Sequence, residues 1–142
     1  MTQYPRSAYD QVGGLVYFAR MLDKIRLKAA GKLLPDYHKN LGIGFDGRCC
    51  RFLGVNYAAV QQQVEQGGSD EAVLQWCFAH GRKPNEEEIL IWSSFMTKRG
   101  WQDDSTKELE RYKAESGFSA RGEIQTFFEY YEFDEGRKQF EA

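Results

Sequence analysis

The sequence predicts an all-α protein, a single-domain bundle of about six or seven helices with no significant β-sheet. Apolar residues recur every three or four positions over several stretches, which places them on one face of a helix. These stretches begin at residues that cap helices and end at glycines, and no sustained apolar–polar alternation predicts a strand. A chain of 142 residues has the length of one domain, so we assign residues 1–142 to a single helical domain.

The longest predicted helix runs from about Ser7 to Ala30, and Gly31 ends it. Gly13 and Gly14 interrupt this stretch, and glycine lowers the stability of a helix interior. The regular helix therefore starts either near Ser7 or only after these two glycines. In both cases we expect one apolar stripe along the helix, made of Val12, Leu15, Val16, Ala19 and Leu22.

Each of the other predicted helices begins at a residue whose side chain can accept a hydrogen bond from backbone N–H groups. The predicted capping residues are Asp46, Asn56, Ser69, Asn85, Ser105 and Ser119. Asn85 and Ser105 are followed three residues later by Glu88 and Glu108, which predicts two capping boxes.

Charged residues interrupt the apolar stripe of the first helix. Asp23 and Arg26 fall inside the stripe, and their spacing of three lets their side chains meet. A buried charge is costly unless it is paired. One interpretation is a buried structural Asp23–Arg26 pair. The other is a polar pocket in which Arg26, helped by Arg20 and Lys24 on the flank, receives an anion.

Residues 42–47, "GIGFDG", match the glycine pattern of dinucleotide-binding loops. That pattern needs a buried strand before it and an acid near the end of the next strand. Here "PDYHKN" precedes it, and the acids about twenty residues later fall on or beside helices. We therefore interpret the stretch as a glycine-rich turn into a short helix capped by Asp46. Backbone N–H groups at that helix start, beside Arg48, suit an anion.

Together the first helix and the following loop form the predicted site, which comprises Arg20, Asp23, Lys24, Arg26, Tyr37, His38, Asn40, Asp46 and Arg48. The leading hypothesis is a binding module for a small anionic ligand or an acidic protein segment. A second hypothesis is an enzyme that uses His38 or Asp46 as acid–base and Arg26 as electrostatic stabiliser. A third is a structural homo-oligomer whose basic and acidic zones meet across an interface.

Composition argues against several other classes of function. A net charge of −2 with interspersed signs argues against nucleic-acid binding. The longest apolar runs fall far short of the ~20 residues of a membrane span, so we expect no membrane insertion. Three cysteines without metal-ligand spacing predict neither a metal site nor a disulfide framework, and we expect no cofactor. No secretory signal is visible, which favours a cytoplasmic protein.

Two stretches carry a family resemblance: "GGLVYFARMLDKIRL" and "YHKNLGIGFDGRCCRFLGV", followed by Trp76. They resemble the bacterial domain-of-unknown-function family 5069, which consists of short, cytoplasmic, helical proteins. The resemblance is strongest over the first eighty residues. It implies a single helical domain in a bacterial cytosol, and it carries over no reaction, substrate or catalytic residue.

Overall fold

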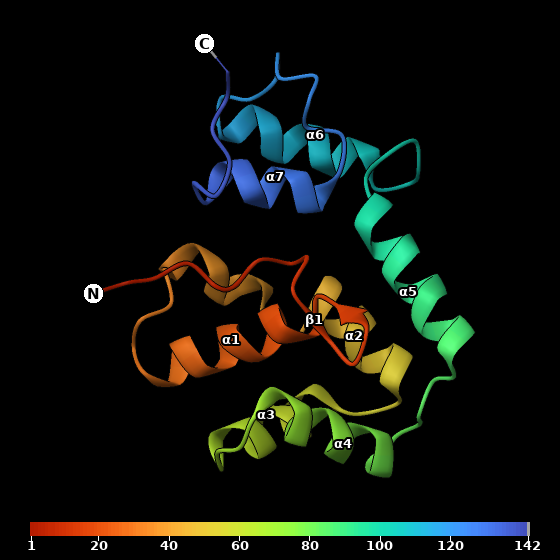
Figure 1. Cartoon of the computed structure of the whole chain (residues 1–142). Helices are drawn as coiled ribbons and strands as arrows, with labels where there is room; N and C mark the ends of the chain where they lie inside the picture. Colours follow the sequence, from red (N-terminus) through yellow and green to blue (C-terminus); the bar gives the residue numbers. More distant parts are fainter. Residues whose placement is uncertain (142) are drawn as a thin grey trace.

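The computed structural model describes residues 1–141 and confirms the all-α prediction (Figure 1). These residues form seven α-helices, one 3-10 helix and one short β-hairpin. In chain order the elements are β1 (Gln11–Val12), β2 (Leu15–Val16), α1 (Phe18–Ala29), η1 (Pro35–Asn40), α2 (Phe45–Leu53), α3 (Tyr57–Glu65), α4 (Asp70–His80), α5 (Glu86–Lys98), α6 (Thr106–Glu115) and α7 (Phe127–Asp134).

The helices are arranged around α1. Figure 1 shows α3 and α4 on one side of α1, the α6–α7 pair on the other, and α5 running along the edge between them. The contacts between elements agree, because α1 packs on α3, α3 on α4, α5 on α7 and α6 on α7. The covering of α1 from two sides decides which of its side chains are buried.

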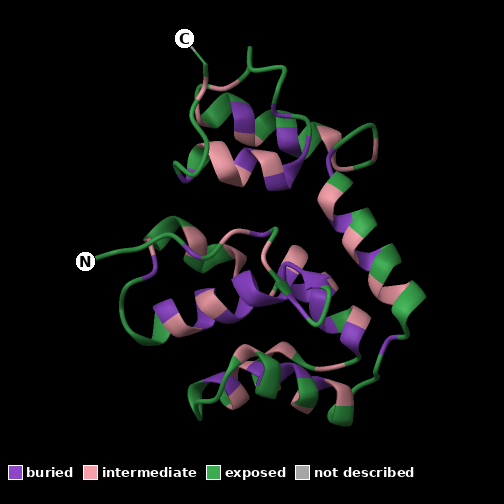
Figure 2. Ribbon diagram, viewed as in Figure 1, coloured by how far each residue is buried: buried purple, intermediate pink, exposed green. Residues whose placement is uncertain are grey.

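The apolar interior consists of two clusters. The larger one surrounds α1, most of which is coloured as buried in Figure 2. Phe18, Met21 and Leu22 of this helix are fully buried. The smaller one belongs to the α6–α7 region and contains Leu109, Ile124, Phe127 and Tyr130. Phe45 and Tyr131 pack against both clusters. The α6–α7 pair thus has a core of its own, and Phe128 of α7, which is fully buried in the larger cluster, joins it to the rest.

The predicted helix start near Ser7 is wrong, and the alternative start after the two glycines is the correct one. Residues 11–16 form an antiparallel hairpin, with Val12 paired to Leu15. Gly13 and Gly14 make its turn at φ 56° and 83°, values that favour glycine. A Cβ on Gly13 would lie only 2.8 Å from Leu74 Cδ2, so the turn also needs close approach to α4. Two-residue strands are too short to show alternation in the sequence.

Three predicted caps are confirmed. The side chains of Asn56, Ser69 and Asn85 accept hydrogen bonds from the first turns of α3, α4 and α5. Asn85 and Glu88 also form the predicted capping box. These signals were reliable because a capping residue acts only on its own first turn.

The caps predicted at Ser105, Ser119 and Asp46 are wrong. The Ser105 side chain makes no capping bond, because Asp103 and Thr106 hold that turn instead and Glu108 pairs with Arg111. The last helix begins at Phe127 and is capped by Thr126. Asp46 lies inside α2, which begins at Phe45, and its carboxylate is fully buried.

None of the described helices combines the length and apolarity needed to cross a membrane.

Gly81, at the end of α4, tests the packing of that helix end on α2. A Cβ there would lie 2.0 Å from the Leu53 carbonyl oxygen, whereas a Cβ on Gly122 would have no atom within 4 Å. We expect Gly81→Ala to lower the free energy of unfolding by about 2 kcal/mol or more, because backbone cannot move aside as a side chain can. Gly122→Ala, measured beside it by urea denaturation, should have little effect. Equal effects of the two substitutions would contradict this account.

Candidate functional site

An open cleft of about 680 Å³ separates the α6–α7 pair from α1, η1 and α2. One wall comes from α1, η1 and α2, and the other from the end of α5, α6 and α7. Its lining combines arginines, tyrosines, phenylalanines and acids. The cleft therefore joins segments that lie far apart in the sequence.

The inner end of the cleft is closed by a buried ion pair between α1 and the residue after α7. The Arg20 guanidinium donates two hydrogen bonds to the Glu135 carboxylate, at 2.8 and 2.6 Å. The two residues are only 4% and 6% exposed. The Tyr37 hydroxyl donates a further bond of 2.6 Å to Glu135, and the Arg20 guanidinium also lies over the Tyr131 ring. This pair ties α7 to α1 and to η1.

The electrostatics of the pair follow from these bonds. Burial alone would raise the pKa of Glu135, but hydrogen bonds from Arg20, Tyr37 and Arg137 bring it below its ordinary 4.5. Burial opposes the charge on Arg20 too, and Glu135 raises the pKa of Arg20 above its ordinary value. Both groups are therefore charged at neutral pH.

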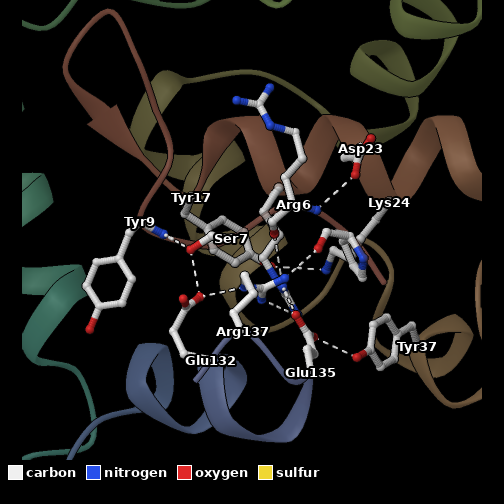
Figure 3. Close-up of polar contacts among 12 residues, drawn as sticks. Arg6, Ser7, Tyr9, Tyr17, Asp23, Lys24, Tyr37, Glu132, Glu135 and Arg137 are labelled. Atoms are coloured by element: carbon white, nitrogen blue, oxygen red, sulfur yellow. Dashed lines mark hydrogen bonds and ion pairs between the residues drawn. The ribbon is translucent and has the colours of Figure 1, made fainter. Parts of the chain in front are cut away.

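The N-terminal segment reinforces the same attachment (Figure 3). Arg137 pairs with Glu132 at 2.8 Å and donates to the Pro5 carbonyl at 3.1 Å. The Ser7 hydroxyl donates to Glu132 at 2.7 Å. The end of α7 is thus held by the N-terminal segment as well as by α1 and η1.

A second buried pair lies deeper, between Lys24 and Asp46. Lys24 Nζ is 2.8 Å from Asp46 Oδ1, and Asp46 is 0% exposed. The Tyr17 hydroxyl donates to Asp46 at 2.6 Å, and the Gly42 N–H donates to its other oxygen at 3.0 Å. Burial lowers the pKa of Lys24, and Asp46 opposes that shift. Asp46 thus fixes the glycine turn against α1, because its carboxylate points inward and does not cap α2.

The predicted Asp23–Arg26 pair is wrong. Both residues are half-buried, and they bind other partners: Asp23 accepts from the Arg6 N–H at 2.9 Å, and Arg26 pairs with Asp70 at 2.5 Å. The buried charges of α1 are those of Arg20 and Lys24. The prediction used a stripe drawn from residues 12–22, part of which forms the hairpin. It also could not foresee that α7 and η1 cover the other side of α1.

The structure brings five of the nine sequence-predicted site residues to the cleft and leaves four outside its lining. Those that line it are Arg20, Lys24, Tyr37, Asn40 and Arg48, and those that do not are Asp23, Arg26, His38 and Asp46. His38 is exposed, and its Nε2 lies 3.1 Å from the Leu33 carbonyl oxygen. Neither His38 nor Asp46, the two alternative acid–base candidates, therefore lines the cleft.

Three arginines converge at the outer end of the cleft, two of them missed by the sequence analysis. Arg48 and Arg51 lie one turn apart on α2, and Arg99 follows α5. The guanidinium groups of Arg48 and Arg99 share the ring of Phe95, at 5.1 and 5.2 Å from its centroid. The i, i+3 spacing of Arg48 and Arg51 was a usable signal. Arg99 and the lining from α6 and α7 had none, since tertiary packing brings them there.

These arginines are incompletely neutralised. Arg99 pairs with Asp103 and Asp104, yet its buried Nε has no hydrogen-bond partner among residues 1–141. Over the same residues, neither Arg48 nor Arg51 comes within ion-pair distance of a carboxylate. Burial, then the positive charges of Arg99 and Arg51, lower the pKa of Arg48. This end of the cleft is suited to receive negative charge.

Between the two ends the walls are aromatic. The Phe45 ring meets Phe127 edge to face at 5.5 Å, and Tyr112 meets Phe127 at 5.8 Å. In the described part of the chain, the hydroxyl groups of Tyr112 and Tyr131 have no protein hydrogen-bond partner. The middle of the cleft therefore offers flat apolar surface with two free hydroxyls.

The described metal-ligating and thiol side chains lie apart from one another or are buried. Residues 1–141 contain no group of three or more His, Cys, Asp or Glu side chains placed to hold a metal ion. The three cysteines are free and buried, and burial raises the pKa of Cys50 to about 11. Its thiol is therefore protonated at neutral pH.

A family model described as Domain of unknown function (DUF5069) matches residues 2–137. No curated protein sequence matches the chain.

The attachment of α7 is tested by removing one partner of the buried pair. Glu135→Ala leaves the Arg20 guanidinium buried without its carboxylate, so we expect the free energy of unfolding to fall by about 3 kcal/mol. Glu115→Ala removes an exposed acid paired with Arg111 and should cost less than about 1 kcal/mol. Urea denaturation gives both values. The double change Arg20→Met with Glu135→Leu should recover part of the loss, and equal costs for the two single variants would contradict a structural role for the pair.

The lowered pKa of Glu135 also predicts acid sensitivity. The unfolded chain takes up this proton at a higher pH than the folded chain does, so the contribution of Glu135 to stability is full above about pH 4.5 and is lost as the pH falls through the folded pKa. The stability difference between the wild type and Glu135→Ala should therefore shrink in acid. Urea midpoints from about pH 7 to about pH 3 measure it. A constant difference over this range would show that Glu135 is not preferentially ionised in the folded state.

Proposed function

The chain belongs to the family described as Domain of unknown function (DUF5069), and we propose that it is a binding module for a small anionic ligand in the cleft between α7 and α1. The observation that carries this proposal is the convergence of Arg48, Arg51 and Arg99 at one end of the cleft. Two of these side chains have no carboxylate partner within residues 1–141, and the third has a buried N–H without an acceptor.

A bound anion would reduce the electrostatic repulsion between these arginines in the free protein. Burial, and after it the positive charges of Arg99 and Arg51, lower the pKa of Arg48, and a bound anion would offset both effects. Glu108 and Glu115 line the cleft on α6, but both pair with Arg111 and so do not neutralise these arginines. A phosphate or carboxylate can accept paired N–H bonds from a guanidinium, which a halide cannot do in the same geometry.

The size and walls of the cleft suit a small molecule. A volume of about 680 Å³ lies within the range of ordinary ligand pockets. The rings of Phe45, Phe127 and Tyr112 supply apolar surface beside the arginines. These features favour a ligand that carries both an anionic group and an apolar body.

The geometry favours binding over the proposed acid–base chemistry. Both Asp46 oxygens are already bonded inside the protein, and His38 lies outside the cleft lining. Neither group can reach a ligand held by the three arginines without rearrangement. The homo-oligomer hypothesis stays a prediction.

Calorimetric titration with inorganic phosphate and with phenyl phosphate tests the proposal. We expect phenyl phosphate to bind more tightly than inorganic phosphate, because only phenyl phosphate uses the aromatic walls. Arg48→Gln combined with Arg51→Gln should weaken both ligands about tenfold or more, since each removes a charge-assisted bond.

Arg121→Gln is the matched control. Arg121 is an exposed arginine that lies over the Phe140 ring, at 3.9 Å from the centroid, and it does not line the cleft. This variant loses one arginine charge outside the cleft, against the two that the double variant loses inside it, and it should bind as the wild type does. Equal weakening by the control, or no detectable binding of either ligand to the wild type, would overturn the proposal.

A further inference from the structure

We propose that the ligand of this cleft is zwitterionic. Its anionic group would lie at the arginine end, its aromatic body in the middle and its protonated amine at the opposite end, near Asp36 and Asp134. This inference rests on the anion site proposed above. It adds the far end of the cleft and so specifies the chemical class of the ligand.

Helix α7 gives the cleft its direction. At its start, the Phe127 N–H donates to the Arg99 carbonyl at 3.0 Å, next to the arginines. Just past its other end, Glu135 bonds to Arg20 and Tyr37. Residues 127–134 of a helix span about 10 Å at 1.5 Å per residue. The two ends are thus separated by roughly the length of one substituted ring.

Two acids at the far end have no ion-pair partner among the described residues, although the charge of Arg20 partly offsets that of Asp134 and Lys39 lines the same end. Asp36 and Asp134 both line the cleft, and over residues 1–141 neither is within ion-pair distance of a cation. Glu135 is adjacent, but its carboxylate is occupied by Arg20, Tyr37 and Arg137. Burial, then the negative charges of Glu135 and Asp36 among its neighbours, raise the pKa of Asp134. Its one side-chain bond, from the Ser116 hydroxyl, is long at 3.4 Å.

The arginine end carries positive charge that is incompletely neutralised by negative partners. The Arg99 side chain is 9% exposed, and its Nε has no acceptor among the described residues. Arg48 and Arg51 stand beside it without carboxylates. Positive charges therefore repel one another at the arginine end, and negative charges repel one another at the far end. A ligand of the opposite polarity relieves both repulsions at once, whereas a ligand negative along its whole length meets repulsion at Asp134.

Three probes test this polarity. Inorganic phosphate carries only the anionic group, phenyl phosphate adds the ring, and 4-(2-aminoethyl)phenyl phosphate adds the amine. The last carries a phosphate and an ammonium at opposite ends of one ring. We expect it to bind about fivefold more tightly than phenyl phosphate, the gain typical of one ion pair open to solvent. Asp134→Asn should abolish that gain and leave the affinity for phenyl phosphate unchanged.

Glu110→Gln is the matched control for Asp134→Asn, because Glu110 is an exposed acid on α6 that does not line the cleft. It should retain the fivefold preference. If both aryl phosphates bind equally to the wild type, or if Asp134→Asn keeps the preference, the proposal of a zwitterionic ligand is wrong while the proposed anion site stands. If no phosphate binds, the anion site itself fails and this inference falls with it.

Discussion

The buried pair of Arg20 and Glu135 is the constraint on which the rest of the structure depends. The α6–α7 pair has its own apolar cluster and shares only a few side chains with the core around α1. Phe128 of α7 is fully buried in the core around α1, and the ion pair adds a directional attachment at the other end of the same helix. The two-pronged bond, extended by Tyr37 and Arg137, supplies direction that apolar contact does not, since hydrogen bonds fix geometry and burial does not.

The cleft is a consequence of this attachment. Charged groups hold α7 against α1 at one end, and the Phe45–Phe127 contact joins the two clusters further along. At the outer end the cleft is open, and Arg48 and Arg51 of α2 and Arg99, which follows α5, line it together with residues of α6 and α7. An apolar junction of the same elements would collapse to core density and leave no cavity.

The cleft therefore contains charged residues that have a protein partner of opposite charge and charged residues that have none. Arg20 and Lys24 are buried and fully partnered, so they determine how the helices pack. Arg48 and Arg51 have no carboxylate partner in the described chain, and burial followed by the charges of Arg99 and Arg51 lowers the pKa of Arg48. The proposed anion site rests on this difference between charges that have a protein partner and charges that do not. The same distinction separates Glu135 from its neighbour Asp134.

By itself the sequence determined what depends on neighbouring residues: the all-α class, the caps at Asn56, Ser69 and Asn85, the stop at Gly81, and the concentration of charge in the first helix and the loop after it. It failed where a residue's role depends on distant segments. Asp23 and Arg26 matched the apolar stripe, yet Arg20 and Lys24 are the buried charges, paired with Glu135 after α7 and with Asp46 of α2. Arg99, Tyr131 and Glu135 enter the site from positions with no local signal. Only the tertiary structure could decide these points, because the partners of Lys24 and Arg20 lie 22 and 115 residues away in the sequence.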